Sequence, residues 1–471
     1  MEESKQEFKQ SLSLMDATMI VAGSMIGSGI FIVSADIIRH VGGAGNLILV
    51  WIITGIMTMA AAVSYGELSG MYPKAGGQYV YLTESWNKLI GFLYGWTLFM
   101  VIQTGTIAAV GVAFAKFAGY FFPVFELTDQ NLLATVGPFK LYYAQLLSIA
   151  IICFLTYINS LGVNGGKIIQ TIFTSTKLIA LFGIILLGFI LGYQQEVWNT
   201  NWANMWDIHQ SFNAADALQS PAIPIVGLFA AAMVGSVFSS DAWNNITFIA
   251  GEVKNPKRNI GLALLLGTGI VTLLYILTNV MYTGVLQLPE IANAPQDRVA
   301  VAAAEKILGV TGTKIIALLI MVSTFGCING MILAGSRVYY TMAKDKLFFK
   351  QVNQLNKNQV PSNALWIQCI WASLLCLSGR YGDLLDYVVF AVLIFYILTI
   401  LGIFRLRKTQ PTIERPYKAF GYPWLPAIYV ILASVMGVCL LIWKPNYTLP
   451  GLGIVLLGIP VYYFTQKNNT N

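Results

Sequence analysis

The stretch GSMIGSGIF, residues 23–31, interrupts the first long apolar segment of this 471-residue chain with three glycines and two serines. A glycine inside a helix costs about 1 kcal/mol relative to alanine, so the run weakens the helix at its middle. If the helix unwinds there, the half that restarts exposes free N–H groups, and its positive dipole end favours an anion such as a carboxylate. The alternative is a close helix–helix contact through Gly23 and Gly27. Gly29 lies outside that small-residue stripe, and this favours a break.

A second apolar segment carries polar residues at its middle, in the stretch SVFSSDAW, residues 236–243. The two interrupted segments are the first of two five-segment halves, residues 14–192 and 223–406. Interrupted helices in corresponding positions of two halves are the best sequence indication of a transporter binding site.

The composition supports the membrane setting that this interpretation needs. Hydrophobic residues make up 56% of the chain and charged residues only 10%, whereas a soluble domain has about 25% charged residues. The 13% of aromatic residues excludes a disordered chain, and continuous apolar runs exclude an outer-membrane barrel. Because a spanning helix needs about 20 apolar residues, the sequence predicts an all-α polytopic membrane protein. Its twelve expected transmembrane helices are residues 14–38, 47–65, 89–122, 141–158, 168–191, 223–250, 260–285, 315–342, 364–378, 384–404, 424–443 and 449–464.

The distribution of Lys and Arg predicts the orientation. Of the 28 Lys and Arg residues, 19 lie in segments on the side of both termini, 8 on the other side, and Lys177 lies inside a span. This bias predicts that both termini lie in the cytoplasm. We expect the membrane to be the plasma (cell inner) membrane. The net charge of +7 therefore reflects topology and gives no reason to expect a nucleic-acid partner. The expected organisation is a cytoplasmic N-terminal segment (1–13), a first half (14–192), an outer loop (193–222), a second half (223–406), and two further helices with a cytoplasmic C-terminus (407–471).

Two charged residues lie deep inside predicted spans. A carboxylate at the bilayer centre costs about 2.5–3.5 kcal/mol on insertion scales, so Asp241 is expected to have a role. It is either a partner for a substrate amine or proton carrier, or a hydrogen-bond acceptor for backbone at the break. Lys177, in the fifth segment, either donates to carbonyls of a broken helix where a metal cation would otherwise bind, or forms a salt bridge with Asp241 or another acid.

Other function classes find little support in the sequence. HExxH, GxSxG and Walker patterns are absent, so an intramembrane enzyme is disfavoured. The five cysteines lie in apolar stretches and behave as small buried hydrophobes, and no His–Cys spacing suggests a metal site or cofactor. A channel is disfavoured because no filter repeat or charge ring appears.

Several stretches together resemble the amino acid–polyamine–organocation (APC) superfamily. The stretch GSMIGSGIF resembles its first-helix motif, and the others are SYGELSGMYPKAGGQYVYL (64–82), FSSDAWNNITFIAGEVKNPKRNI (238–260) and RPYKAFGYPWLP (415–426). The match runs in order along nearly the whole chain. It is closest to the L-type amino acid transporter subgroup and its bacterial relatives.

The resemblance implies a five-plus-five inverted repeat of the leucine-transporter type, with discontinuous helices 1 and 6 and two additional helices. It implies a permease that moves neutral L-amino acids by alternating access, by exchange or proton coupling. In the L-type subgroup a lysine on helix 5, here Lys177, replaces a sodium ion, so transport is expected to be sodium-independent.

The family's substrate contacts carry over onto the two interruptions. The substrate carboxylate is expected at the backbone amides of Ser28 and Gly29, with Gly27 permitting close approach and the Ser28 hydroxyl assisting. The α-amine is expected at carbonyls of the preceding half-helices, and an aromatic at the position of Phe238 acts in the family as an outer gate. The residues expected at the amine are Ile26, Phe238, Ser239 and Asp241.

Two departures from the family pattern bear on substrate and partner. Ser240 and Ala242 stand where some relatives have an aromatic residue and a glycine, and Asp241 is shared with some relatives that accept cationic substrates. Cationic amino acids or polyamines are therefore the alternative substrates. The outer loop at 123–140 lacks the cysteine that binds an ancillary subunit in eukaryotic L-type proteins, so no disulfide-linked ancillary subunit is expected.

Overall fold

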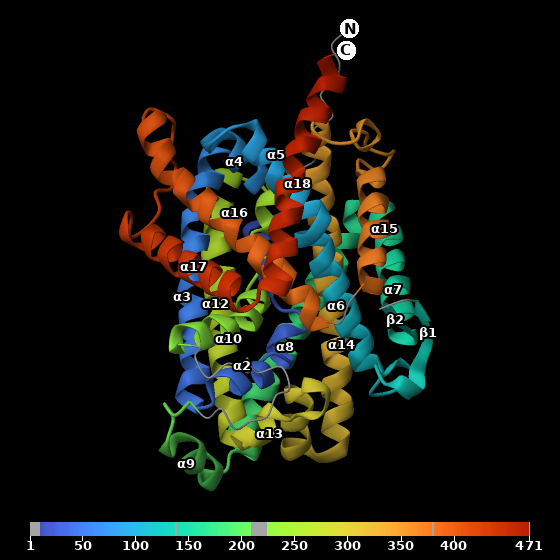
Figure 1. Cartoon of the computed structure of the whole chain (residues 1–471), viewed down its shortest axis with the longest axis vertical. Helices are drawn as coiled ribbons and strands as arrows, with labels where there is room; N and C mark the ends of the chain where they lie inside the picture. Colours follow the sequence, from blue (N-terminus) through green and yellow to red (C-terminus); the bar gives the residue numbers. More distant parts are fainter. Residues whose placement is uncertain (1–9, 137–138, 209–223, 379–380, 471) are drawn as a thin grey trace.

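The computed structural model describes residues 10–136, 139–208, 224–378 and 381–470. It is a bundle of helices, most of which run along the long axis of the molecule (Figure 1). In these residues nine helices are long and apolar enough to cross a membrane, and three shorter apolar helices accompany them. Together they fall on the twelve predicted segments. The predicted N-terminal segment 1–13 lies largely outside the described residues, and the predicted loop 193–222 lies partly outside them.

The first half of the chain contains helices α1–α9, with a 3₁₀ turn η1 and the π-helical turns η2 and η5 at interruptions. Their bounds are α1 Leu14–Met25, η1 Gly29–Phe31, α2 Ser34–Val41, α3 Ala44–Met71, α4 Gln78–Ser85, α5 Lys88–Thr97, η2 Leu98–Ile102, α6 Gln103–Ala118, α7 Tyr143–Ser160, α8 Val163–Leu187, η5 Gly188–Gly192 and α9 Gln195–Ala203. The second half and the two further helices are α10 Ile225–Ser239, α11 Asn245–Phe248, α12 Pro256–Val285, α13 Leu288–Ala292, α14 Val299–Lys344, α15 Ser362–Ser378, α16 Tyr381–Thr409, α17 Trp424–Trp443 and α18 Pro445–Thr470.

The predicted break in the first span is confirmed. A capping box between Ser13 and Asp16 starts α1, and the helix ends at Met25 because Ile26 takes an extended conformation (φ −74°, ψ 92°). The chain restarts as η1 at Gly29 and continues into α2. The first span is thus two half-helices joined through the glycine-rich stretch.

The sixth span is broken as well. Its first part, α10, ends at Ser239, and the short α11 begins at Asn245. Between them Ala242 has a left-handed backbone (φ 63°), which a residue with a side chain adopts at a cost. The discontinuous helices 1 and 6 of the predicted fold are therefore present.

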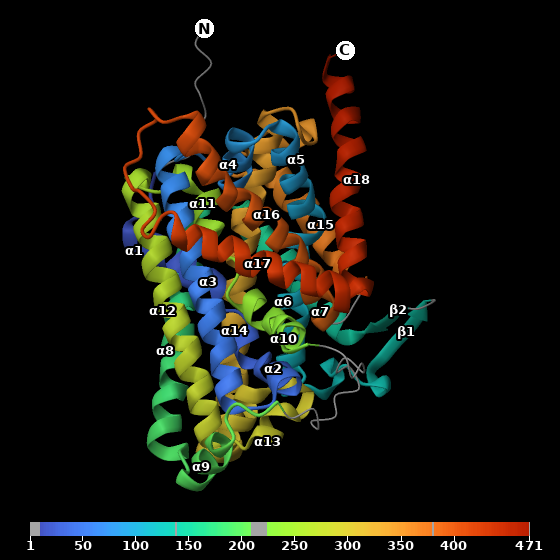
Figure 2. The ribbon, with the colours of Figure 1, turned by 60° about the vertical axis from the view of Figure 1, so that its left-hand side comes forward.

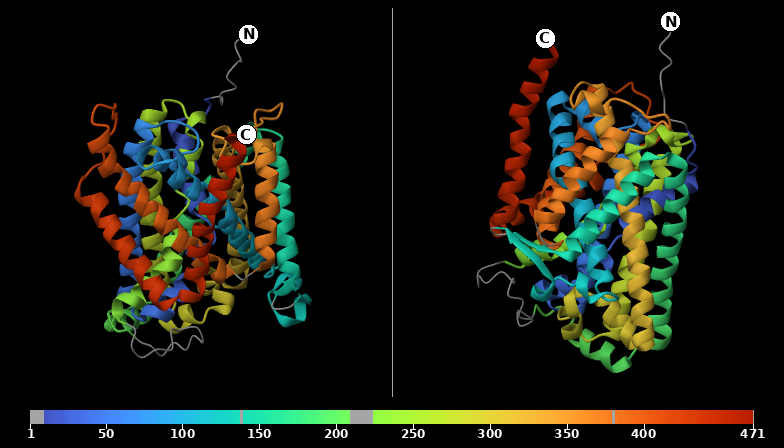
Figure 3. Two further views of the ribbon diagram at one scale, coloured as in Figure 1. Left: turned by 45° about the horizontal axis from the view of Figure 1, so that its top comes forward. Right: turned by 90° about the vertical axis from the view of Figure 1, so that its right-hand side faces the viewer.

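Two features lie beyond the predicted pattern. A two-stranded antiparallel hairpin, β1 Leu132–Val136 and β2 Phe139–Tyr142, interrupts the otherwise helical chain and projects from the side of the bundle (Figure 3). Helix α14 runs for 46 residues because a helix on the loop continues into the span across a kink at Gly309 (φ 65°). Both are local additions that leave the predicted bundle intact.

The two faces of the bundle are distinguished by their loops. Leu12 pairs with Val253, and the C-terminal end of α18 lies on the same upper side, which is called the terminal face below (Figures 1 and 2). Helices α9 and α13 lie on the opposite face (Figure 2). Helix α1 packs against α8, α12 and α14, and α10 packs against α2, so that the two breaks lie together inside the bundle.

Candidate functional site

A buried lysine binds the end of the first half-helix. The break in the first span leaves backbone carbonyls there without helical partners, and the lysine donates to them. The ammonium of Lys177, on α8, donates to the carbonyl of Gly23 at 2.6 Å and to that of Ile26 at 2.8 Å. Lys177 is fully buried. The sequence left two arrangements open for Lys177, bonds to helix carbonyls or a salt bridge with an acid such as Asp241. The structure has the bonds to carbonyls, and Asp241 bonds to Tyr396 instead. A positive charge at the negative end of the α1 dipole is the favourable sign.

Further side chains complete the capping of the same turn. The thiol of Cys327 donates to the carbonyl of Ser24 at 3.1 Å, and the Ser323 hydroxyl lies 3.3 Å from that of Ile26. The hydroxyl of Tyr275, on α12, lies 3.0 Å from the carbonyl of Met25. Each carbonyl from Gly23 to Ile26 therefore has a side-chain donor, and the donors come from three helices, α8, α12 and α14.

The other side of the break presents backbone amides at a helix start. The N–H of Phe31 donates to the carbonyl of Ser28 at 3.1 Å, so Ser28 and Gly29 open the first turn of the restarted helix. The first amides of a helix have no intrahelical acceptor, and the dipole there favours an anion. Both residues are buried. The sequence predicts that a substrate carboxylate binds to these amides.

Gly29 brings the two breaks into direct contact. A Cβ atom built on Gly29 would lie 1.9 Å from the Ser239 hydroxyl oxygen and 2.6 Å from the Ser239 Cβ. A non-bonded carbon needs about 3.5 Å or more, so only glycine fits. Gly27 is less constrained, since its Cβ would lie 3.2 Å from the Cys327 sulfur.

The carbonyls of the second break are already partly used. The Asp241 N–H donates to the carbonyl of Phe238 at 3.2 Å, and the carbonyl of Ser239 lies 3.1 Å from the Tyr275 hydroxyl. Because the same hydroxyl reaches Met25, Tyr275 spans the two breaks. Each carbonyl oxygen has two lone pairs, so the carbonyls of Phe238 and Ser239 can each accept one more hydrogen bond.

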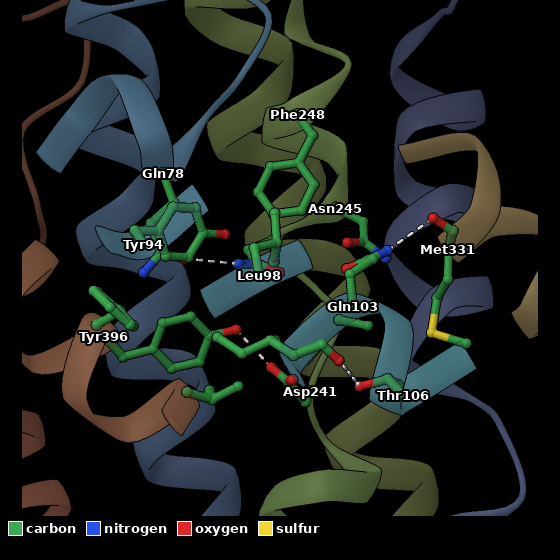
Figure 4. Close-up of a pocket in the computed structure, with 15 residues that line it drawn as sticks. Gln78, Tyr94, Leu98, Gln103, Thr106, Asp241, Asn245, Phe248, Met331 and Tyr396 are labelled. Carbon is green, nitrogen blue, oxygen red and sulfur yellow. Dashed lines mark hydrogen bonds between the residues drawn. The ribbon is translucent and has the colours of Figure 1, made fainter. Parts of the chain in front are cut away.

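Asp241 lines a pocket beside the breaks (Figure 4). The pocket is small, with a volume of about 10 Å³ for the centres of water-sized molecules, and it is bounded by α4, the α5–η2–α6 span, α11, α14 and α16. The Tyr396 hydroxyl donates to the Asp241 carboxylate at 2.5 Å. In the part of the chain that the structure describes, the carboxylate has no cationic partner. More of the exposed wall is apolar than polar, and its polar side chains are Gln78, Tyr94, Gln103, Thr106, Asp241, Asn244, Asn245 and Tyr396.

The pocket separates the predicted site residues into two groups. Of the eight residues that the sequence singled out, only Asp241 lines it. The other seven surround the contact between the two breaks, and they are Ile26, Gly27, Ser28, Gly29, Lys177, Phe238 and Ser239. The amide groups and the carboxylate therefore belong to adjoining parts of one region, since Asp241 directly follows the end of α10.

Ion pairs and backbone hydrogen bonds are present near both faces of the bundle. On the opposite face Arg39 of α2 pairs with Asp297 at 2.7 Å, and Lys116 lies 3.8 Å from the same carboxylate. On the terminal face the buried pair Glu252–Arg337 (3.1 Å) lies beneath the N-terminal segment. There the amide of Leu12 donates to the Glu252 carbonyl at 2.9 Å.

Several residues that contact the breaks were not among the predicted site residues, Cys327 and Ser323 among them. Tyr275 and Tyr396 bond to the breaks from α12 and α16, but a tyrosine in an apolar helix has no local signal that marks it. The described residues contain no group of three or more His, Cys, Asp or Glu side chains that could hold a metal ion.

Comparison with known proteins agrees with this architecture. A family model described as "Amino acid permease" matches residues 12–459. The chain is 30% identical over 461 residues to the Asc-type amino acid transporter 1 of Mus musculus, a match that covers 97% of this chain and 81% of that protein. It is 30% identical over 458 residues to the human large neutral amino acids transporter small subunit 2 (97% and 80% covered). It is 28% identical over 461 residues to the human b(0,+)-type amino acid transporter 1 (97% and 88% covered).

Fold and site define a multi-pass membrane permease built around two broken helices. The chain belongs to the amino acid permease family, within the APC superfamily to which its motifs pointed. It is a transport protein and not an enzyme, and its relatives indicate that it carries amino acids.

Proposed function

We propose that the protein is a secondary active transporter that moves neutral L-amino acids across the plasma membrane by alternating access around the two breaks. Transport is sodium-independent and uses exchange or proton coupling. The observation that carries the proposal is the contact between the amide-rich start at Ser28–Gly29 and the carbonyl-bearing end of α10, which offers donors for a carboxylate beside acceptors for an amine. A zwitterionic α-amino acid needs hydrogen-bond donors for its carboxylate next to acceptors for its ammonium group.

Each predicted residue has a role in this proposal. The amides of Ser28 and Gly29 receive the carboxylate, with Gly27 leaving room and the Ser28 hydroxyl assisting. The amine is held by carbonyl oxygens of Ile26, Phe238 and Ser239 together with Asp241. The Phe238 ring, which is buried at the end of α10, acts as the gate.

Lys177 is the reason to propose sodium independence. Carbonyl oxygens at a helix end are the hard ligands that Na⁺ and similar cations use. Here the ammonium already donates to two of them, at Gly23 and Ile26, and side chains cap the two between. A sodium ion would have to displace a buried charge of the same sign.

Topology and organisation complete the proposal. The terminal face is cytoplasmic, in keeping with the Lys and Arg bias of the sequence. Residues 14–192 and 223–406 form the two inverted halves, and residues 407–471 add the two outer helices. Since the loop at 123–140 has no cysteine, no disulfide-linked ancillary subunit is needed.

Uptake of labelled amino acids into proteoliposomes tests the function. We expect neutral L-amino acids to compete for uptake, and replacement of Na⁺ by choline to leave the initial rate unchanged. Loading the vesicles with substrate, or imposing a pH gradient, separates exchange from proton coupling. If none of the twenty amino acids competes, the proposed function is wrong, and a dependence on Na⁺ would contradict the role of Lys177.

A cationic substrate is the second candidate, and one observation favours it. Asp241 faces the pocket with a tyrosine hydroxyl as its partner and no cation among the described residues. A carboxylate that is buried without a cation gains from a cationic ligand.

Replacing Asp241 by Asn separates the two candidates. If the carboxylate binds a cationic side chain, the apparent KM for lysine or arginine should rise at least about tenfold more than that for a neutral substrate, since losing about 1.4 kcal/mol of binding is a factor of ten. The matched control is Tyr396→Phe, which removes the neighbouring hydroxyl and keeps the charge. Equal losses for neutral and cationic substrates would assign Asp241 to the α-amine or the backbone.

A further inference from the structure

Two thiols from different helices face each other away from the proposed substrate site. The sulfur atoms of Cys153 on α7 and Cys369 on α15 lie 3.6 Å apart, and both cysteines are free. Cys369 is buried (2% exposed), and Cys153 is half-buried. Helices α7 and α15 pack along each other, so the pair lies on a helix–helix contact that the proposed transport function does not use.

The distance between the sulfurs suits an atom that bridges them. A disulfide requires about 2.05 Å, so the sulfurs would have to approach each other by about 1.5 Å. Two thiolates on one tetrahedral centre, with metal–sulfur bonds of about 2.3 Å, lie about 3.8 Å apart. The observed separation, at which the Cys369 thiol donates to the Cys153 sulfur, lies within a few tenths of an ångström of the second geometry, so the two sulfurs would have to move little to bind one centre.

The thiol pair has polar neighbours. The hydroxyls of Thr156 and Ser373 flank the Cys369 thiol within hydrogen-bonding reach. Thr156 is completely buried. The two sulfurs are therefore surrounded partly by hydroxyl groups and not by hydrocarbon alone.

The position of the pair limits the charge of that ligand. Nearby residues on α7, such as Phe154 and Tyr157, are 51% and 54% exposed on an apolar helix and so face lipid. An ion enters this environment only at high cost. A soft centre that accepts two thiolates and stays neutral avoids that cost, because soft centres prefer sulfur ligands.

We propose that Cys153 and Cys369 form a dithiol site for a neutral, thiophilic metalloid centre that arrives through the lipid, such as a trivalent organoarsenical. The reaction is a condensation: R–As=O and two S–H groups give R–As(S)₂ and one water. Two S–H bonds and the arsenic–oxygen bond break while two As–S bonds form. Arsenic remains trivalent, so neither an oxidant nor a reductant is needed. The product joins α7 to α15.

Phenylarsine oxide tests the site on the full-length protein in lipid nanodiscs. We expect intact-mass measurement to find one phenylarsenic adduct per chain, removed by a dithiol competitor but not by an equal concentration of a monothiol. The melting temperature of the wild-type protein should rise on binding. Cys153→Ser and Cys369→Ser should each abolish the adduct and the rise in melting temperature, and both should keep their uptake activity, which the site does not serve.

The matched control is Cys376→Ser. Cys376 lies two turns further along α15 and its sulfur contacts the carbonyl of Ala108, so this variant should bind the arsenical as the wild type does. An adduct that survives in either single variant of the pair would overturn the proposal. So would a wild-type protein that forms no adduct, because the site would then be closed to lipid.

Discussion

Lys177→Ala should reduce amino acid uptake at least about tenfold while the protein still reaches the membrane. The ammonium makes two charge-assisted bonds, to Gly23 at 2.6 Å and Ile26 at 2.8 Å, that fix the end of α1. Hydrogen bonds to charged groups are worth about 1.5–3 kcal/mol each, and about 1.4 kcal/mol is a factor of ten. Without them the carbonyl end of the half-helix is no longer held where the substrate amine is expected.

Two further variants separate the role of the charge from packing. Lys177→Met keeps most of the volume and should lose as much transport as the alanine variant. Lys257→Ala removes an exposed lysine whose partner is Glu414 on the surface and should leave uptake within about twofold, because exposed pairs contribute little. A Lys177→Met protein with normal uptake would assign Lys177 to packing alone.

Gly29→Ala should be the second variant with a very large effect, lowering uptake to about a tenth or less of wild type. The added methyl would lie 1.9 Å from the Ser239 oxygen and 2.6 Å from the Ser239 Cβ, so the two breaks must move apart. Overpacking of this kind costs about 1–3 kcal/mol, and here it falls on the amide that is expected to bind the carboxylate. The initial rate of uptake, corrected for protein content, is the measurement.

The contact can be tested by restoring it. Ser239→Gly removes both clashing side-chain atoms, so the double variant Gly29→Ala/Ser239→Gly should recover part of the lost uptake. If the two substitutions acted independently, the double variant would instead lose the sum of the two single losses. Gly437→Ala is the matched control, because a Cβ there meets nothing within 4 Å. If Gly29→Ala alone transports at the wild-type rate, the two breaks do not touch in the working protein.

The broken helices could be predicted because their cause is local. Three glycines in the stretch from Gly23 to Gly29 weaken a helix whatever surrounds it, and a carboxylate at Asp241 is costly in any apolar span. Lys177 was an intermediate case. Its depth in the span indicated a partner, but only the packing of α8 against α1 decides that the partner is a pair of carbonyls.

The remaining contacts depend on distant parts of the chain. Tyr275 reaches Met25, which is 250 residues away in sequence, and Tyr396 reaches Asp241 across 155 residues. Neither tyrosine differs in its neighbourhood from other aromatic residues of apolar helices. The hairpin β1–β2 and the kink at Gly309 were missed for a different reason. They arise from local backbone geometry in loops, where hydropathy gives no information.

The short pairing between Leu12 and Val253 allows opening of the terminal face to be measured without attaching a reporter group to the protein. The amides of Ser11 and Leu12 donate to the Glu252 carbonyl, and the amide of Lys254 donates to that of Leu12. These are main-chain bonds, so every movement of the N-terminal segment away from residues 252–254 must break them together. Their deuterium exchange rates therefore report how often this pairing opens on the face proposed to be cytoplasmic, and a transported substrate should change all three rates in the same sense.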